Sequence, residues 1–332
     1  MISGLINVIQ VAGEGESVHR WRVAAGLAAA VGVAVAASAC GATSDSTPAT
    51  PGAGATGASS RTIRVVAAES FWGSLASQLG GAHVQVRSII DNPNADPHDY
   101  EPTAADGRAI ATADLVLVNG VGYDTWASKL VAANPAPNRI VLDVGQVLGV
   151  PDGGNPHRWY NPDDVNKVVD QLARDFATAD PADASAFQTQ KATFENRTLA
   201  GYKQVIADIE TRYAGTPVGA SESIFAMVAP ALGLDLITPS AFLKAISEGT
   251  DPAAADKATI DQQIAQKKIK VYVYNSQNAT PDVQSQVDAA TATGIPVTTI
   301  TETMVPATST WQDWQTRQLV ALRDALAKAT SR

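Results

Sequence analysis

The stretch TIRVVAAESFWGSLASQLGGAHVQVRSII, residues 62–90, decides the fold. Its first part, Thr62–Ala68, is a short β-branched and apolar run, which is typical of a buried strand. Ser70–Gly80 then reads as a helix, and Val84–Ile90 is a second strand candidate. A strand, a helix and another strand in immediate succession predict an α/β fold in which the strands are largely parallel.

The same alternation continues to the end of the chain. Further strands are expected at Leu115–Asn119, Ile140–Val144, Pro217–Ala220, Leu234–Thr238, Lys270–Tyr274 and Pro296–Ile300. Further helices are expected at Ala104–Thr112, Asp124–Ala132, Ala254–Lys267 and Ala279–Ala292. The strand candidates are bounded by Gly, Pro, Asn or Asp, the residues that commonly end strands.

A helical insert divides the strands into two groups of four. Asn161 and Pro162 have the residue types of a helix N-cap and first helical position. Apolar residues then keep helical spacing from Phe187 to Tyr213, which predicts one long helix. We therefore expect two similar α/β lobes joined by a single long backbone helix, with an N-terminal lobe at 61–160, a helical segment at 161–215 and a C-terminal lobe at 216–332.

The N-terminal residues have the pattern of an export signal. A basic segment, His19–Arg22, precedes the apolar run Val23–Ala37, and small residues lead directly to Cys40, the single cysteine of the chain. The ending resembles a bacterial lipobox, so we expect residues 1–39 to be a signal peptide and Cys40 to be lipidated. Residues 40–60 lack large apolar side chains, which predicts a flexible linker. The alternative is an ordinary secretory peptide with an incidental cysteine.

Composition excludes several classes of protein. With 332 residues, 45% of them hydrophobic, the chain is long enough for two domains of ordinary size. Its formal net charge of −9 argues against nucleic acid as a partner, because such binding needs clustered Lys and Arg. Because Cys40 is the only cysteine, a thiolate metal site and a structural disulfide are both excluded.

Two of the four histidines occur in similar contexts. His98 and His157 each follow a proline, and each comes after the end of a predicted strand. Open α/β sheets bind ligands at the carboxyl ends of their strands, so these two side chains are expected to share a site. His19 lies in the signal segment, and His83 lies at a turn, where a structural or solvated role is expected.

The second lobe contains no histidine, but two carboxylates occupy matching positions. Glu222 follows the strand Pro217–Ala220, and Glu302 follows the strand Pro296–Ile300. Each adjoins apolar sequence, where an unpaired carboxylate would be costly to bury and a cation would offset that cost. Two histidines from one lobe and two glutamates from the other predict a metal ion bound between the lobes. Taken alone, either glutamate would be read as a helix cap or a surface residue.

Several stretches resemble one known family. They are DPHDYEPTAAD (96–106), NGVGYDTWASKLV (119–131), NPHRWYNPDDV (155–165) and SESIFAMVAPALGL (221–234), together with the long middle helix. The resemblance is to the metal-specific substrate-binding proteins of bacterial ABC importers, the zinc and manganese group in which one rigid helix joins two lobes. It covers the chain from about residue 61 to the C-terminus.

The resemblance implies a role for each candidate residue. His98 and His157 would bind the metal, Glu222 would be the third ligand and Glu302 the fourth, although this family more often has Asp at the last position. Asn275 stands where many members have Glu. The implied protein is a monomer, is not an enzyme, needs no catalytic cofactor, and is lipid-anchored on the extracytoplasmic face of the membrane beside its permease.

The identity of the metal stays open at this stage. Imidazole suits zinc, whereas carboxylates able to chelate through both oxygens favour manganese or iron. Four-coordinate zinc with oxygen ligands is also compatible. Two other functions remain: a secreted metal-dependent hydrolase, which would need an open coordination position and a general base, and a binding protein for a metal chelate.

The anchor gives the first prediction. Cys40→Ser should release the protein into the medium and leave its metal affinity unchanged, because the tether and the site are independent. Cell fractionation followed by immunoblotting measures the release, and unchanged membrane association of the variant would reject the lipobox interpretation.

Overall fold

The computed structural model describes residues 61–93, 95, 97 and 100–331. The expected signal peptide, Cys40 and the linker 40–60 lie outside these residues, as does His98. Within the described part of the chain, no helix combines the length and the apolar composition needed to cross a membrane.

The first sheet contains the four strands expected before the helical insert. Its order is β2-β1-β3-β4 and all pairs are parallel. In the register, Ala67 pairs with Leu117, which in turn pairs with Leu142. The strands are β1 (Ile63–Glu69), β2 (Val84–Ile90), β3 (Leu115–Val118) and β4 (Ile140–Asp143).

The second sheet repeats this arrangement with the order β6-β5-β7-β8, again entirely parallel. Its strands are β5 (Pro217–Ala220), β6 (Asp235–Leu236), β7 (Val271–Asn275) and β8 (Val297–Ile300). The predicted α/β class with two parallel lobes is confirmed. Only β6 is much shorter than expected: it is an edge strand paired with β5 alone, and Pro239 begins the turn into the next helix.

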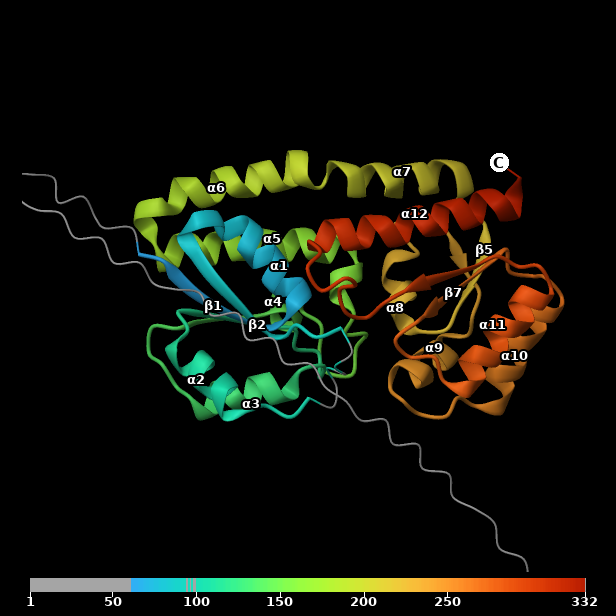
Figure 1. Ribbon diagram of the computed structural model, residues 1–332, viewed down its shortest axis with the longest axis horizontal. Helices are drawn as coiled ribbons and strands as arrows, with labels where there is room; N and C mark the ends of the chain where they lie inside the picture. The colour runs from blue at the N-terminus through green and yellow to red at the C-terminus, as the bar shows by residue number, and fades with distance from the viewer. Residues whose placement is uncertain (1–60, 94, 96, 98–99, 332) are drawn as a thin grey trace, which may run out of the picture. The chain divides into compact units, whose positions relative to one another are not determined.

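Helices connect successive strands, so parallel pairing is possible in both lobes (Figure 1). The helices between strands are α1 (Ser70–Gly80), α2 (Ala104–Thr112), α3 (Thr125–Ala133), α4 (Val144–Leu148), α5 (Pro162–Ala179), α6 (Ala184–Thr193), α7 (Ala200–Tyr213), α8 (Ser223–Val228), α9 (Ser240–Ser247), α10 (Ala254–Ala265) and α11 (Pro281–Ala292), and α12 (Trp311–Thr330) follows the last strand. Two predicted N-termini are confirmed by their caps. Thr103 and Asp106 form a capping box at α2, and the Asn161 side chain accepts from the first turn of α5.

The expected long helix is present but is not a regular α-helix throughout. A π-helical turn, η4 (Phe194–Thr198), separates α6 from α7. Phe187 and Tyr213, which defined the sequence pattern, are both fully buried. The pattern therefore located the helix correctly, while the π turn, which has no marker in the pattern, shifts the faces of the two halves relative to one another.

The C-terminal helix α12 provides a second helical connection that the sequence analysis did not predict. It runs beside α7 (Figure 1), and its first turn contacts the first lobe. The backbone N–H of Trp311 donates to Ser74 Oγ at 3.0 Å, and its indole N–H donates to the carbonyl oxygen of Trp159 at 3.2 Å. The lobes are thus joined by α12 as well as by the expected helix.

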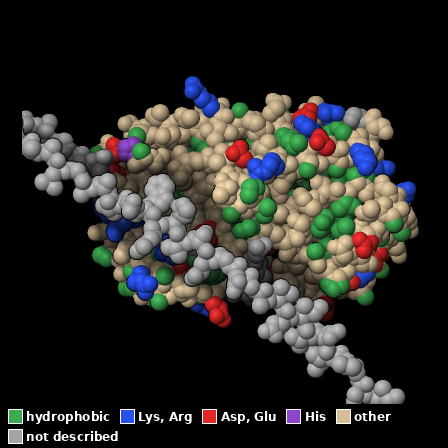
Figure 2. Space-filling model, in the orientation of Figure 1, with side chains coloured by type: hydrophobic (Ala, Val, Ile, Leu, Met, Phe, Trp, Pro, Cys, Tyr) green, Lys and Arg blue, Asp and Glu red, His purple; other side chains and the backbone are tan. Residues whose placement is uncertain are grey.

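The hydrophobic core is continuous across this junction. Trp159 is fully buried in this core and stacks on Phe71, with ring centroids 3.9 Å apart. The surface carries mixed charge: on the face shown in Figure 2, basic and acidic side chains are interspersed. Such a surface has no concentrated positive patch on that face for a nucleic acid to bind.

The junction gives a second prediction. Trp311→Ala should lower the free energy of unfolding by about 3–5 kcal/mol, because it removes a fully buried indole from the contact between α12 and the first lobe. Urea denaturation measures the change. The control is Asp324→Ala on the exposed face of α12, which should change stability by less than about 0.5 kcal/mol. Equal effects of the two substitutions would contradict a structural role for Trp311.

Candidate metal-binding site

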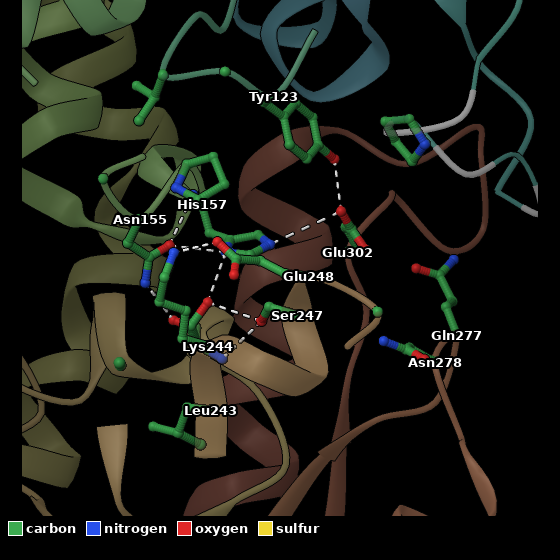
Figure 3. A pocket seen from close by; sticks show the side chains of 18 of the residues that line it. Tyr123, Asn155, His157, Leu243, Lys244, Ser247, Glu248, Gln277, Asn278 and Glu302 are labelled. Atoms are coloured by element: carbon green, nitrogen blue, oxygen red, sulfur yellow. Dashed lines mark hydrogen bonds and ion pairs between the residues drawn. The ribbon is translucent and has the colours of Figure 1, made fainter. Parts of the chain in front are cut away.

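A cleft of about 930 Å³ is lined by helix α9 and by loops from both lobes (Figure 3). These loops follow the carboxyl ends of strands, where parallel sheets place their ligand-binding groups. Tyr123 follows β3, and His157 lies farther along the chain after β4. Ser223 follows β5 and Glu302 follows β8, so both sheets contribute polar side chains to one space.

His157 is buried and held by its neighbour Asn155. The Asn155 side-chain oxygen accepts from the backbone N–H of His157 at 3.1 Å and lies 2.8 Å from its Nδ1. The amide nitrogen of Asn155 donates to the carbonyl oxygen of Ser223 in the other lobe at 2.7 Å. That contact fixes the amide orientation, so Nδ1 of His157 carries the proton and Nε2 is the nitrogen able to bind a metal.

Glu302 faces that nitrogen across the cleft. Its Oε1 lies 3.8 Å from Nε2 of His157 and accepts a hydrogen bond from the Tyr123 hydroxyl at 2.8 Å (Figure 3). Two ligands bound at about 2.0–2.2 Å to one tetrahedral ion lie roughly 3.4 Å apart. The His157–Glu302 separation is therefore close to what a shared metal ion requires.

Glu222 is also buried at the end of its strand. It precedes the cleft-lining Ser223 and forms the N-cap of α8. Its Oε2 accepts from the side-chain amide of Asn275 at 3.2 Å. This neutral donor stabilises a carboxylate that burial would otherwise disfavour.

The described residues contain only part of the predicted ligand set. His157 and Glu302 are brought together, but no group of three or more His, Cys, Asp or Glu side chains in the described part of the chain could hold a metal ion. His98 lies outside the described residues, although Pro97, directly before it, lines the cleft. His83 has a different partner: its Nδ1 lies 2.7 Å from Oδ2 of Asp183, the N-cap residue of α6.

Three residues around the candidate ligands were not predicted to have a role. Tyr123, Asn155 and Asn275 each form a hydrogen bond to a candidate ligand side chain. Tyr123 and Asn155 stand in stretches that carried the family resemblance, and Asn275 stood out only as a departure from it. Their position after predicted strands was a signal that the sequence contained. Their hydrogen-bond partners could not be read from the sequence.

Two α/β lobes that meet at a polar cleft define the class of two-lobed solute-binding proteins. Within this class, the chain belongs to the family described as zinc-uptake complex component A, periplasmic (ZnuA), which matches residues 65–325. The resemblance drawn from the sequence motifs is confirmed at the level of the family.

Individual relatives are distant. The manganese-binding lipoprotein MntA of Halalkalibacterium halodurans is 29% identical over 133 residues, which cover 38% of this chain and 42% of that protein. The metal ABC transporter substrate-binding lipoprotein FimA of Streptococcus parasanguinis is 24% identical over 71% of this chain and 78% of its own length. The chain thus spans less than half of the first relative and about three quarters of the second.

Solved structures confirm the fold. The Mn-bound periplasmic metal binding protein from Candidatus Liberibacter asiaticus superposes with a TM-score of 0.66 at 18% identity, covering 80% of this chain and 99% of that one. FpvC from Pseudomonas aeruginosa, solved in complex with Mn²⁺, gives a TM-score of 0.66 at 21% identity over 81% and 100% of the two chains.

Two further carboxyl groups, those of Glu69 and Asp124, are buried near Tyr123. Burial, followed by the proximity of Asp124, raises the pKa of Glu69 well above its usual value. Asp124 accepts the backbone N–H groups of Asn119 and Gly120 at 2.7 and 2.8 Å, but burial still raises its pKa to about 6. Burial and the nearby Asp124 therefore both favour the protonated form of Glu69, and the two groups titrate as a coupled pair.

This pair gives a third prediction. A raised native pKa means that the folded protein binds more protons than the unfolded chain, so stability falls as pH rises from about 4.5 through the native pKa of Glu69. Glu69→Gln keeps a neutral donor and should flatten this fall, which is at most about 1.4 kcal/mol per pH unit for one proton. Urea unfolding at pH 5, 6.5 and 8 compares the two proteins. Parallel stability profiles would contradict a protonated Glu69.

Proposed function

We propose that this protein captures a divalent transition metal, zinc or manganese, outside the cytoplasm and delivers it to the membrane permease of an ABC importer. Family membership supports the role, since the related proteins are metal-binding components of transporters. The observation that carries the proposal is the approach of His157 Nε2 and Glu302 Oε1 to 3.8 Å, one from each side of the cleft. His98 and Glu222 complete the proposed ligand set.

The remaining features of the proposal follow from the same assignment. The protein acts as a monomer held at the membrane by lipidated Cys40, in keeping with relatives that are named lipoproteins. It performs no catalysis, because four protein ligands leave no open coordination position for a reacting water. We place the domain limits near 61–160, 161–215 and 216–332, and the division of the strands into two sheets supports this proposal.

The size of the cleft favours a second candidate cargo. A metal ion with six waters of about 30 Å³ each occupies roughly 180 Å³, far less than the 930 Å³ between the lobes. A small metal chelate would fit, and Lys244, Ser247 and Asn278 supply polar groups on the cleft wall. Tight binding of zinc or manganese in buffer free of chelators would support the bare ion and reject the chelate.

The ligand assignment gives a fourth prediction. His157→Ala should weaken zinc and manganese binding by more than the roughly 10–100-fold caused by loss of an outer-shell partner. Elemental analysis of protein purified without added metal, followed by titration, measures binding. Trp159 offers an intrinsic fluorescence signal, because its ring centroid lies 5.3 Å from that of His157.

The control is His83→Ala, which removes an imidazole paired with Asp183 and should leave binding unchanged. Equal losses in the His83 and His157 variants would show that the site is misplaced. If the Glu302→Ala variant binds metal with near-normal affinity, the fourth ligand is a different oxygen, from Asp99, Glu101 or water.

A further inference from the structure

The loop that carries Glu302 has no regular secondary structure. Strand β8 ends at Ile300, and α12 begins only at Trp311. Sheet pairing therefore does not fix the backbone around Glu302, and its position depends on the side chains that bind the two neighbouring residues. On one side, the backbone N–H of Thr301 donates to the side-chain oxygen of Gln318 on α12 at 2.7 Å.

On the other side of Glu302, Thr303 is bound by Gln277. The backbone N–H of Thr303 donates to the side-chain oxygen of Gln277 at 2.9 Å, and the side-chain nitrogen of Gln277 donates to the Thr303 hydroxyl oxygen at 2.7 Å. Thr303 is buried, whereas Gln277 lies at the exposed rim of the cleft. These two bonds fix the orientation of the Gln277 amide, because only its oxygen can accept from a backbone N–H.

Both side chains also reach the first lobe. The carbonyl oxygen of Pro93, in the loop after β2, accepts from the side-chain nitrogen of Gln277 at 2.7 Å and from the Thr303 hydroxyl at 3.1 Å. A carbonyl oxygen has two lone pairs and can accept both bonds. We call Gln277, Thr303 and the Pro93 carbonyl the interlobe clasp. The clasp connects the loop of Glu302 in one lobe to the backbone of the other lobe.

A second connection between the lobes lies beside His157. Asn155 of the first lobe donates to the carbonyl oxygen of Ser223 in the second lobe at 2.7 Å. In Figure 3, Gln277 lies beyond Glu302 on the side away from Asn155, so the two facing candidate ligands lie between the two connections. A movement of the lobes that separates His157 from Glu302 would therefore also break the clasp.

We propose that Gln277 and Thr303 are positioning residues for Glu302. By connecting its loop to the first lobe, they keep Glu302 facing His157 and slow the release of a bound metal ion. Release requires the facing ligands to separate, and this separation breaks the two bonds to Pro93. The inference rests on the proposed function and adds the residues that control how long the metal stays bound.

The test compares the unaltered protein with Thr303→Val and Gln277→Ala. Thr303→Val keeps the size of the buried side chain and its backbone N–H, but it removes the donor to Pro93 and the acceptor for Gln277. Protein loaded with zinc or manganese is mixed with an excess of a chromophoric chelator, which reports the rate of release. We expect each substitution to speed release about tenfold. The double variant should fall short of the product of the two effects, because both substitutions break the same contacts.

A second measurement, on metal-free protein, reports the connection between the lobes directly. Nitroxides on Lys129→Cys in α3 and Ala258→Cys in α10, both at exposed positions, give the distance between the lobes by electron paramagnetic resonance in a Cys40→Ser background. Thr303→Val should broaden the distance distribution. Gln262→Ala is the matched control, because this glutamine is exposed on α10 and should affect neither the distance nor the release rate.

A Thr303→Val variant that releases metal at the unaltered rate, or that keeps the unaltered distance distribution, would overturn this inference alone. If Thr303→Val fails to fold, the same two measurements on Gln277→Ala, at the exposed rim, decide the question. An unaltered protein that binds neither zinc nor manganese would reject the proposed function instead, and the distance distributions would still test the clasp.

Discussion

The parallel direction of all the strands in both sheets is the constraint on which the site depends. Parallel pairing brings the carboxyl ends of neighbouring strands to one edge, so the loops that leave these ends gather there. In this protein the two edges face a common cleft. Tyr123 after β3, Glu302 after β8 and the later His157 reach it because the connecting helices return each chain segment to the opposite edge.

The distance between His157 and Glu302 depends on contacts that lie away from the cleft. Helix α12 runs beside α7 and contacts the first lobe through Trp311, whose indole donates to Trp159. Trp159 stacks on Phe71 and lies beside His157 in the same aromatic cluster. Because this cluster is close-packed, a shift of one lobe would disturb many contacts at once, which favours a defined distance between the candidate ligands carried by different lobes.

The glutamates near the strand ends have two different environments, which favour different protonation states. Glu222 and Glu302 each accept from a neutral donor, which favours an ionised carboxylate ready for a cation. Glu69 instead lies against Asp124, whose oxygens already accept two backbone N–H groups, so Glu69 retains a proton. The same residue type is thus a candidate ligand at one strand end and a neutral structural group at another.

The sequence by itself determined the approximate positions of the strands and of several helices, the α/β class and the residue types able to bind a metal, because strand runs and helix caps depend on neighbours a few positions away. Only the tertiary structure decided the short edge strand β6, the position of α12 and the hydrogen-bond partners of each candidate ligand. Tyr123 and Glu302 are 179 residues apart in the chain, and the π turn η4 leaves no mark in the periodicity. Such contacts depend on how complete lobes pack together, and no local pattern encodes that packing.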